Sequence, residues 1–134
     1  MSLVCRPPTL VEVRRAESRG LGGRGVYAID AIDAGTLIER SPVLLIPKAD
    51  LEPRGVLMSY LFDWSHKPRE RVCLGLGYLS LYNHQTHSNA TWALERPDLM
   101  TVTAVADIAA GEEVTIHYFG EPGDEDEMPF EVKA

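Results

Sequence analysis

Short segments in which apolar and polar residues alternate are the feature that most limits how this chain of 134 residues can fold. Alternation with a period of two predicts β-strands, and glycine or proline punctuates the chain between such segments. The strand-like segments are residues 9–14, 24–29, 36–39, 43–46, 72–76, 89–94, 99–106 and 113–118. Strands and helices do not alternate regularly, so the sequence predicts a mainly β domain with a compact, loop-rich core.

Pro42 separates two of these segments, and it predicts an edge strand or a bulge because proline cannot donate to a strand ladder. Residues 32–35 and 108–111 have the similar sequences Ile-Asp-Ala-Gly and Ile-Ala-Ala-Gly. Both predict turns, although the similarity is too short to establish a repeat.

One segment has the pattern of a helix. Asp50 can cap its start, with Glu52 and Pro53 in the first turn. Apolar residues then follow at helical spacing and form one stripe. The stripe consists of Leu57, Tyr60, Leu61 and Trp64. The sequence therefore predicts one short helix within a mainly β chain.

Charge is unevenly distributed along the chain. The formal net charge is −7; residues 121–134 carry six acids and one lysine (−5), whereas residues 1–120 carry fourteen acids and twelve bases (−2). Nucleic-acid surfaces need clustered bases that displace counterions, so this balance argues against direct nucleic-acid binding. It suits a basic partner such as a lysine-rich peptide, and the alternative is an acidic tail that only aids solubility.

Cys5 and Cys73 are the only cysteines, so the chain has neither a disulfide framework nor a paired-cysteine zinc pattern. No apolar run approaches the roughly 18 residues of a membrane span. Arg6, Pro7 and Pro8 stand where a signal peptide would need an apolar region. We expect an intracellular protein, cytoplasmic or nuclear, that does not enter a membrane.

Residues 77–92 concentrate two Asn, two His, two Tyr and one Trp in sixteen positions. Carboxamide and small polar side chains favour irregular backbone, so residues 83–89, the Asn-His loop, should be a structured loop that leads into a strand. Asn donates and accepts at once, and such a loop can bind a small polar ligand. The alternative is a turn held by its own hydrogen bonds. His84 and His87 lie three apart, but the loop offers no third ligand at metal-binding spacing.

Two further segments can carry chemistry. Gly23-Arg24-Gly25, the Gly-Arg-Gly segment, leads into a strand, where glycine permits close backbone approach to a ligand or simply a flexible turn. It lacks the Gly-Lys-Ser/Thr ending of a phosphate loop. Residues 111–118, the Tyr118 segment, end in a tyrosine that either packs with its hydroxyl in water or orients a substrate amine. No nucleophile-elbow or Ser-His-Asp pattern occurs.

These three segments, in this order, resemble the SET-domain protein-lysine methyltransferases. Residues 23–26 are similar to the family's Gly-x-Gly entry, residues 83–89 to its Asn-His-Ser-Cys-x-Pro-Asn, and residues 111–118 to its Gly-Glu-Glu-Leu-Thr-x-Asp-Tyr. The resemblance spans residues 9–120, which leaves residues 1–8 as an N-terminal extension and 121–134 as an acidic C-terminal tail.

The resemblance implies a fold of several small β-sheets with one short helix insert and a C-terminal pseudoknot, a threading that is otherwise rare. It implies S-adenosylmethionine as the cofactor on one face and a protein or peptide lysine entering by a narrow channel from the other. It assigns the catalytic role to Tyr118 and the channel to Trp92 and, less directly, Tyr78. The implied cofactor-binding residues are Gly23, Arg24, Gly25, Asn83, His84 and Tyr118.

Several positions depart from the family pattern. Gln85, Thr86 and Ser88 replace the usual Ser, Cys and Pro, and His117 replaces the usual Asp. The second aromatic, two residues after the tyrosine, is Gly120 here, with Phe119 one place early, and no zinc-binding cysteine cluster follows. The chain thus resembles the minimal SET proteins, and the apolar stripe makes a homodimer plausible. The substitutions also leave open a catalytically degenerate SET-like module that binds the cofactor or a peptide.

Overall fold

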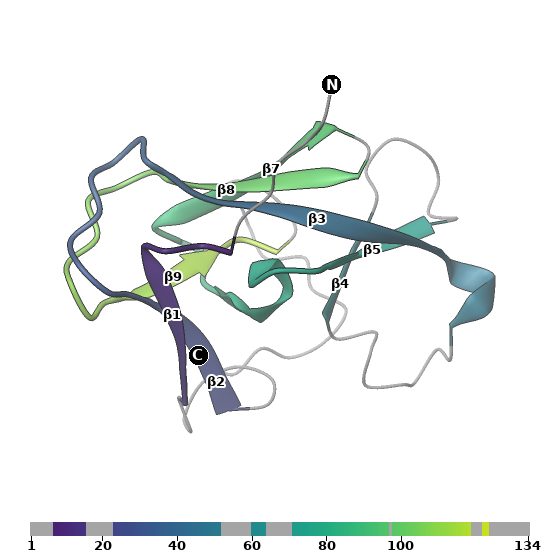
Figure 1. Ribbon diagram of the computed structural model, residues 1–134, viewed down its shortest axis with the longest axis horizontal. Coiled ribbons are helices and arrows are strands. Elements are labelled where there is room, and N and C mark those ends of the chain that lie inside the picture. Colours follow the sequence, from purple (N-terminus) through teal and green to yellow (C-terminus); the bar gives the residue numbers. More distant parts are fainter. Residues whose placement is uncertain are drawn as a thin grey trace.

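The computed structural model describes residues 7–15, 23–51, 60–63, 71–96, 98–118 and 122–123, which form two β-sheets (Figure 1). The first sheet has the strand order β1-β2-β9-β6 and consists of β1 (Val11–Arg15), β2 (Arg24–Ala28), β9 (Glu113–Ile116) and β6 (Asn83–His84). The second has the order β4-β5-β3-β8-β7 and consists of β4 (Leu61–Asp63), β5 (Arg71–Gly75), β3 (Leu37–Pro47), β8 (Leu99–Ala104) and β7 (Ala90–Arg96). The prediction of a mainly β domain is confirmed.

Pro42 lies inside a continuous strand rather than between two strands at an edge. Residues 37–42 of β3 pair with β8, and residues 43–47 pair with β5, so the strand changes partner at Pro42. A missing N–H is tolerated there because both ladders end at this point. The bulge occurs instead between Leu37 and Glu39. The prediction of an edge or bulge at Pro42 itself was therefore wrong.

The helix predicted after Asp50 was also wrong in its second half, where the structure has a strand. Leu61 belongs to β4 and pairs with Leu74 of β5, and Lys48–Asp50 form a single 3-10 turn. Ladder hydrogen bonds to β5 outweigh a short apolar stripe, because helix propensity is a weak preference that tertiary pairing overrides. Leu57 and Trp64 lie outside the described residues.

The two similar turns face each other. Ile32 and Ile108 form an antiparallel bridge in which each N–H donates to the other's carbonyl oxygen at 2.8 Å. Gly35 and Gly111 close the turns with φ of +88° and +80°, in the left-handed region that glycine enters without strain. Both turn predictions are confirmed, and the similarity reflects a pairing of the turns.

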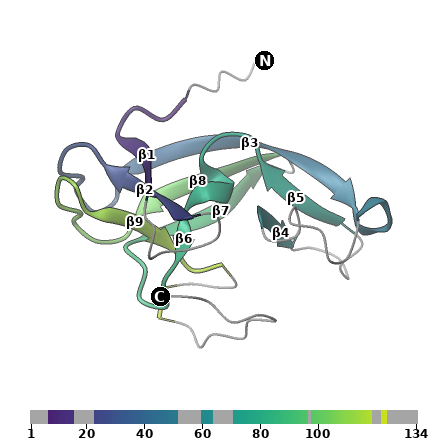
Figure 2. The same cartoon turned by 90° about the horizontal axis from the view of Figure 1, so that it is seen from below.

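β9 and the described residues after it lie against the Asn-His loop. β6 pairs in parallel with β9, Asn83 opposite Thr115 and His84 opposite Ile116 (Figure 2). A parallel pair needs a long connection, and β7 with β8 supplies it. Beyond β9, the N–H of Gly123 donates to the oxygen of Thr86 at 2.6 Å. The last described residues are thus held against the loop that contains the Asn-His pair.

The core lies between the two sheets and under the crossing of β6 and β9. Its fully buried members come from nearly every strand, which places the Asn-His loop on a rigid support. They include Val26, Ala28, Cys73, Leu79, Ala90, Val102, Val114 and Ile116.

Candidate functional site

Asn83 joins the three predicted segments. Its Nδ2 donates to the main-chain oxygen of Arg24 at 2.9 Å and to the Glu113 carboxylate at 2.7 Å. Gly25 permits this approach, because a Cβ there would lie 2.5 Å from Glu113 Oε2 and 3.0 Å from Asn83 Nδ2. The Gly-Arg-Gly segment, the Asn-His loop and the Tyr118 segment therefore meet at one carboxamide.

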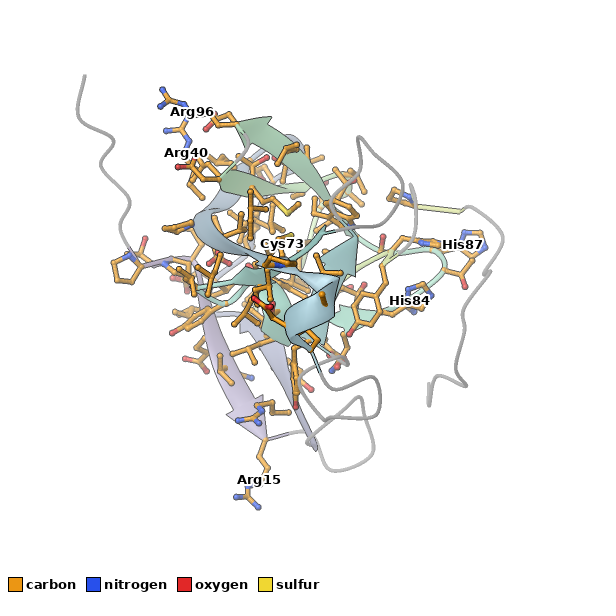
Figure 3. All side chains as sticks on the ribbon, turned by 90° about the vertical axis from the view of Figure 1, so that its right-hand side faces the viewer. Arg15, Arg40, Cys73, His84, His87 and Arg96 are labelled. Atoms are coloured by element: carbon orange, nitrogen blue, oxygen red, sulfur yellow. The ribbon has the colours of Figure 1, made fainter. Side chains whose placement is uncertain are left out.

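His84 connects the loop to the segment beyond β9. Its Nδ1 accepts a hydrogen bond from the main-chain N–H of Tyr118 at 3.0 Å, so this nitrogen carries no proton. Its ring lies edge-on to His117, 4.7 Å between centroids, and 5.2 Å from the ring of Tyr118. His84 and His117 are both buried, whereas His87 is exposed and lies farther from the sheets (Figure 3).

Tyr118 is half-buried, and its hydroxyl donates to the main-chain oxygen of Tyr82 at 2.8 Å. Trp92, on β7, donates from Nε1 to the main-chain oxygen of His117 at 2.8 Å. Trp92 and Tyr118 are thus held through adjacent residues of one segment. A hydroxyl that donates its proton acts toward other groups only as an acceptor, which defines how Tyr118 can meet a ligand.

Asn89 locks the far end of the Asn-His loop. Its Nδ2 donates to the oxygen of Glu113 at 2.8 Å, and its Oδ1 accepts from the N–H of Thr115 at 2.9 Å. Ser88 makes a local bond at the end of the loop, from its hydroxyl to the main-chain oxygen of Ala90, the first residue of β7. The loop is therefore held mainly by β2 and β9 and not by its own turn.

Glu39 is a buried carboxylate beside the site that the sequence reasoning missed. Its two oxygens accept from the N–H of Tyr78 at 2.7 Å and from the hydroxyl of Tyr82 at 2.8 Å. Burial raises the pKa of Glu39, against the smaller effect of these two bonds. Burial, followed by the charge of Glu39, raises the pKa of Tyr82 well above 10, so its hydroxyl stays protonated. The sequence did offer one signal that could have identified Glu39: an acidic residue within a strand segment of apolar pattern. Tyr78 lies in this cluster, through its N–H bond to Glu39.

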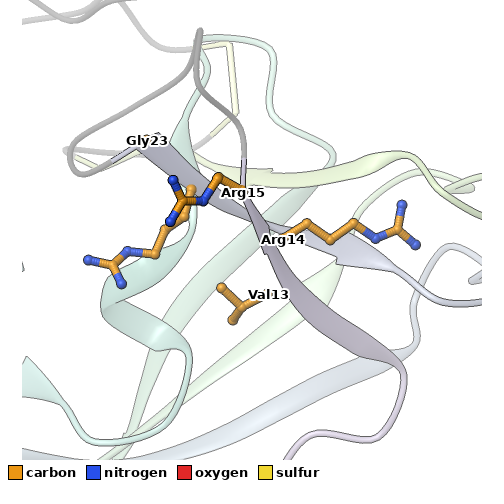
Figure 4. Close-up of a pocket in the computed structure, with 5 residues that line it drawn as sticks. Val13, Arg14, Arg15 and Gly23 are labelled. Carbon is orange, nitrogen blue, oxygen red and sulfur yellow. The ribbon is translucent and has the colours of Figure 1, made fainter.

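A cavity of about 240 Å³ lies where β1 ends and β2 begins (Figure 4). It is lined by Val13, Arg14, Arg15, Gly23 and Arg24. Arg14 and Arg15 point to opposite sides of β1, and Arg14 is paired with Glu12 and stacked over Tyr27. Because Arg24 also bonds to Asn83 through its main-chain oxygen, the cavity adjoins the Asn-His loop.

Within the described ranges, no three His, Cys, Asp or Glu side chains come together as metal ligands would. Among the same residues, none of the helical turns has the length and apolar character that crossing a bilayer requires.

The model of the SET-domain family matches residues 23–119. The chain belongs to the SET-domain family. A histone-lysine N-methyltransferase of Schizosaccharomyces pombe, specific for lysine 37 of histone H3, is 37% identical over 119 residues, covering 86% of this chain and 76% of that protein. The crystal structure of a candidate histone methyltransferase of Plasmodium falciparum is similar with a TM-score of 0.64 at 27% identity, covering 84% of this chain and 94% of that one.

The predicted family and the SET fold with its crossed C-terminal segment are confirmed. This SET-domain protein is a protein-lysine methyltransferase. The roles assigned to individual residues remain predictions.

Proposed function

We propose that this SET-domain protein binds S-adenosylmethionine along the Gly-Arg-Gly segment and the Asn-His loop, and that Tyr118 aligns the reacting lysine amine. The observation that carries the proposal is the convergence of the three segments: Asn83 bonds to Arg24 and Glu113, and His84 bonds to Tyr118. Residues distant in sequence thus form one surface that the hydrogen bonds hold rigid.

The donor set fits the cofactor. S-adenosylmethionine carries a carboxylate, and guanidinium groups such as those of Arg15 and Arg24 at the cavity recognise carboxylates. The cavity of about 240 Å³ is smaller than the roughly 300–1,000 Å³ of pockets that enclose a whole ligand. We therefore assign it to the amino-acid end of the cofactor, with Gly23, Gly25, Asn83 and His84 beside the remainder.

When bound, S-adenosylmethionine supplies an electrophilic methyl group on a sulfonium, which leaves as a neutral thioether. The protein has to align the attacking amine, and positioning alone can supply much of the rate. The amine must be neutral, and an apolar channel lowers the lysine pKa from about 10.4 by disfavouring the cation. Trp92 provides an aromatic wall for the lysine stem and a methylated ammonium.

Tyr118 acts in this proposal through its oxygen. Its proton is used in the bond to Tyr82, so the phenolic oxygen presents an acceptor to the amine. His84 fixes the backbone at Tyr118, and Trp92 fixes the adjacent carbonyl of His117. Tyr78, which lies at Glu39, is the weaker channel candidate.

The proposed substrate is a lysine in a basic protein segment of the histone type. The Schizosaccharomyces pombe relative is named for histone H3. The net charge of −7 favours encounter with a lysine-rich chain and disfavours direct nucleic-acid contact. Such a substrate agrees with a nuclear or cytoplasmic location.

The deciding experiment is transfer of labelled methyl from S-adenosylmethionine to histones and other abundant basic proteins. Transfer to lysine, lost when that lysine is replaced by arginine, supports the proposal. Calorimetry on the same sample separates the alternative: cofactor binding without transfer to any substrate would indicate a degenerate binding module. Absence of cofactor binding would remove the proposed site.

Self-association is a further part of the proposal. Leu44 and Leu76, from β3 and the residue after β5, are 51% and 58% exposed, so apolar surface remains on this sheet. Tyr60 and Leu61 of the predicted stripe are half-buried. We expect a homodimer in sedimentation velocity at high concentration, and a monomer throughout would contradict it.

A further inference from the structure

Glu39 is a buried carboxylate on β3, with 3% of its surface exposed. The bulge between Leu37 and Glu39 interrupts the alternation of β3, so Ile38 and Glu39 are both buried although they are neighbours. Burying a carboxylate is costly unless its oxygens are hydrogen-bonded. Both oxygens are bonded here, to the Tyr78 N–H and the Tyr82 hydroxyl.

Residues 77–82 are folded tightly over this carboxylate. A Cβ on Gly77 would lie 2.2 Å from Glu39 Oε2, so only glycine allows the backbone to approach this closely. The N–H of Gly77 donates to the hydroxyl of Ser41, also on β3, at 3.1 Å. This segment leads directly into Asn83 and His84, so β3 determines where the Asn-His loop begins.

We propose that Glu39 is a positioning residue for methyl transfer, because it fixes Tyr82, whose main-chain oxygen receives the hydroxyl proton of Tyr118. The connection has two hydrogen bonds, each of 2.8 Å: Tyr82 hydroxyl to Glu39, and Tyr118 hydroxyl to Tyr82 oxygen. The inference rests on the proposed role of Tyr118. It adds a residue on β3 to a site otherwise built from β2, β6, β7, β9 and the residues that follow β9.

An ionised acceptor makes stronger and more directional bonds than a neutral one, so the carboxylate holds Tyr82 more rigidly than packing alone would. A displacement of about 1 Å in a positioned group can reduce a rate about a hundredfold. Loss of the Glu39 bond should therefore reduce the chemical step beyond what general destabilisation does.

The test compares Glu39→Ala, Glu39→Gln and Tyr82→Phe in single-turnover methyl transfer at saturating cofactor, with cofactor Kd from calorimetry. We expect Glu39→Ala and Tyr82→Phe each to slow transfer about ten- to a hundredfold, with Kd changed less than about threefold. The double variant that combines Glu39→Ala with Tyr82→Phe should transfer methyl no more slowly than the slower of the two single variants, because both substitutions remove the same hydrogen bond. Glutamine can accept from Tyr78 and donate to the Tyr82 oxygen, so Glu39→Gln should restore most of the rate.

The matched control is Ile108→Val or Ile108→Ala, whichever is closer in melting temperature to the test variant, since Ile108 is buried at the paired turns. A rate loss in Glu39→Ala no larger than that of the control, or additive losses in the double variant, would overturn the inference. If Glu39→Ala does not fold, the rate of Tyr82→Phe is the deciding measurement. A Tyr82→Phe rate equal to that of the parent would overturn the inference about Glu39.

Tyr118→Phe in the same assay distinguishes the two levels of the argument. If Tyr118→Phe is slow while Tyr82→Phe is as fast as the parent, Glu39 has no positioning role and the proposed function stands. If Tyr118→Phe is itself fast, the proposed role of Tyr118 fails, and the inference about Glu39 fails with it.

Discussion

The hydroxyl of Tyr118 donates a 2.8 Å hydrogen bond to the main-chain oxygen of Tyr82, the residue immediately before the Asn-His pair. This bond ties the end of the Tyr118 segment to the start of the Asn-His loop. It sets the orientation of the phenolic oxygen, and it makes that oxygen an acceptor toward any incoming amine.

Tyr118→Phe keeps the ring and removes this oxygen. We expect turnover to fall by about tenfold to a thousandfold, the scale of losing one positioned polar group in a transition state. Cofactor affinity should change much less, because the His84 bond is to the Tyr118 main chain and survives. Single-turnover methylation beside a thermal melt measures both effects. A variant as fast as the parent would take Tyr118 out of the mechanism.

Asn83→Ala removes the carboxamide that bonds to Arg24 and Glu113. We expect cofactor affinity to fall about tenfold or more, on the order of 1–2 kcal/mol for lost polar contacts. Ser88→Ala is the matched control, since it removes a local polar contact made by another side chain of the same loop. Calorimetric titration compares the two, and an unchanged Kd for folded Asn83→Ala would place the loop outside the cofactor site.

Gly25→Ala and Gly35→Ala separate crowding at the site from general backbone strain. A Cβ at Gly25 meets Glu113 and Asn83, whereas at Gly35 it meets nothing within 4 Å but is strained by a φ of +88°. Gly35→Ala should cost about 1–2 kcal/mol of stability with cofactor affinity unchanged. Gly25→Ala should weaken cofactor binding about tenfold or more by displacing Asn83. Equal affinities in the two variants would contradict this account.

Glu39 predicts a pH dependence of stability. Burial raises the pKa of Glu39 in the folded state above its ordinary value of 4.5. At pH values between 4.5 and the folded-state pKa, the folded state therefore binds more protons than the unfolded state. The contribution of Glu39 to stability therefore falls as pH rises through that window, and Glu39→Gln removes this fall.

Urea unfolding of the parent and Glu39→Gln at a series of pH values measures the effect. The free energy of unfolding of the variant minus that of the parent should increase as pH rises from about 4.5 through the folded pKa, and then level off. A difference that stays flat, or that grows toward acid pH, would show that the carboxylate is not held in the environment described.

Local pattern accounts for much of the agreement between sequence and structure. The strands around Val26, Val102 and Val114 follow from alternation, and the turns at Gly35 and Gly111 follow from glycine punctuation, because both signals depend on neighbouring residues only. The three motifs also have local signatures, so the family and the candidate residues Asn83, His84 and Tyr118 could be named before any contact was known.

What the sequence by itself determined is thus the positions of most strands, the mainly β class and the membership of the SET-domain family. Only the tertiary structure decided that β3 continues through Pro42, that Leu61 joins a strand, and that Glu39 and Tyr82 support Tyr118. The physical reason is separation along the chain. The Glu39–Tyr82 and Tyr118–Tyr82 bonds join residues 43 and 36 positions apart, and the packing that brings such residues together leaves no periodic trace in the sequence around them.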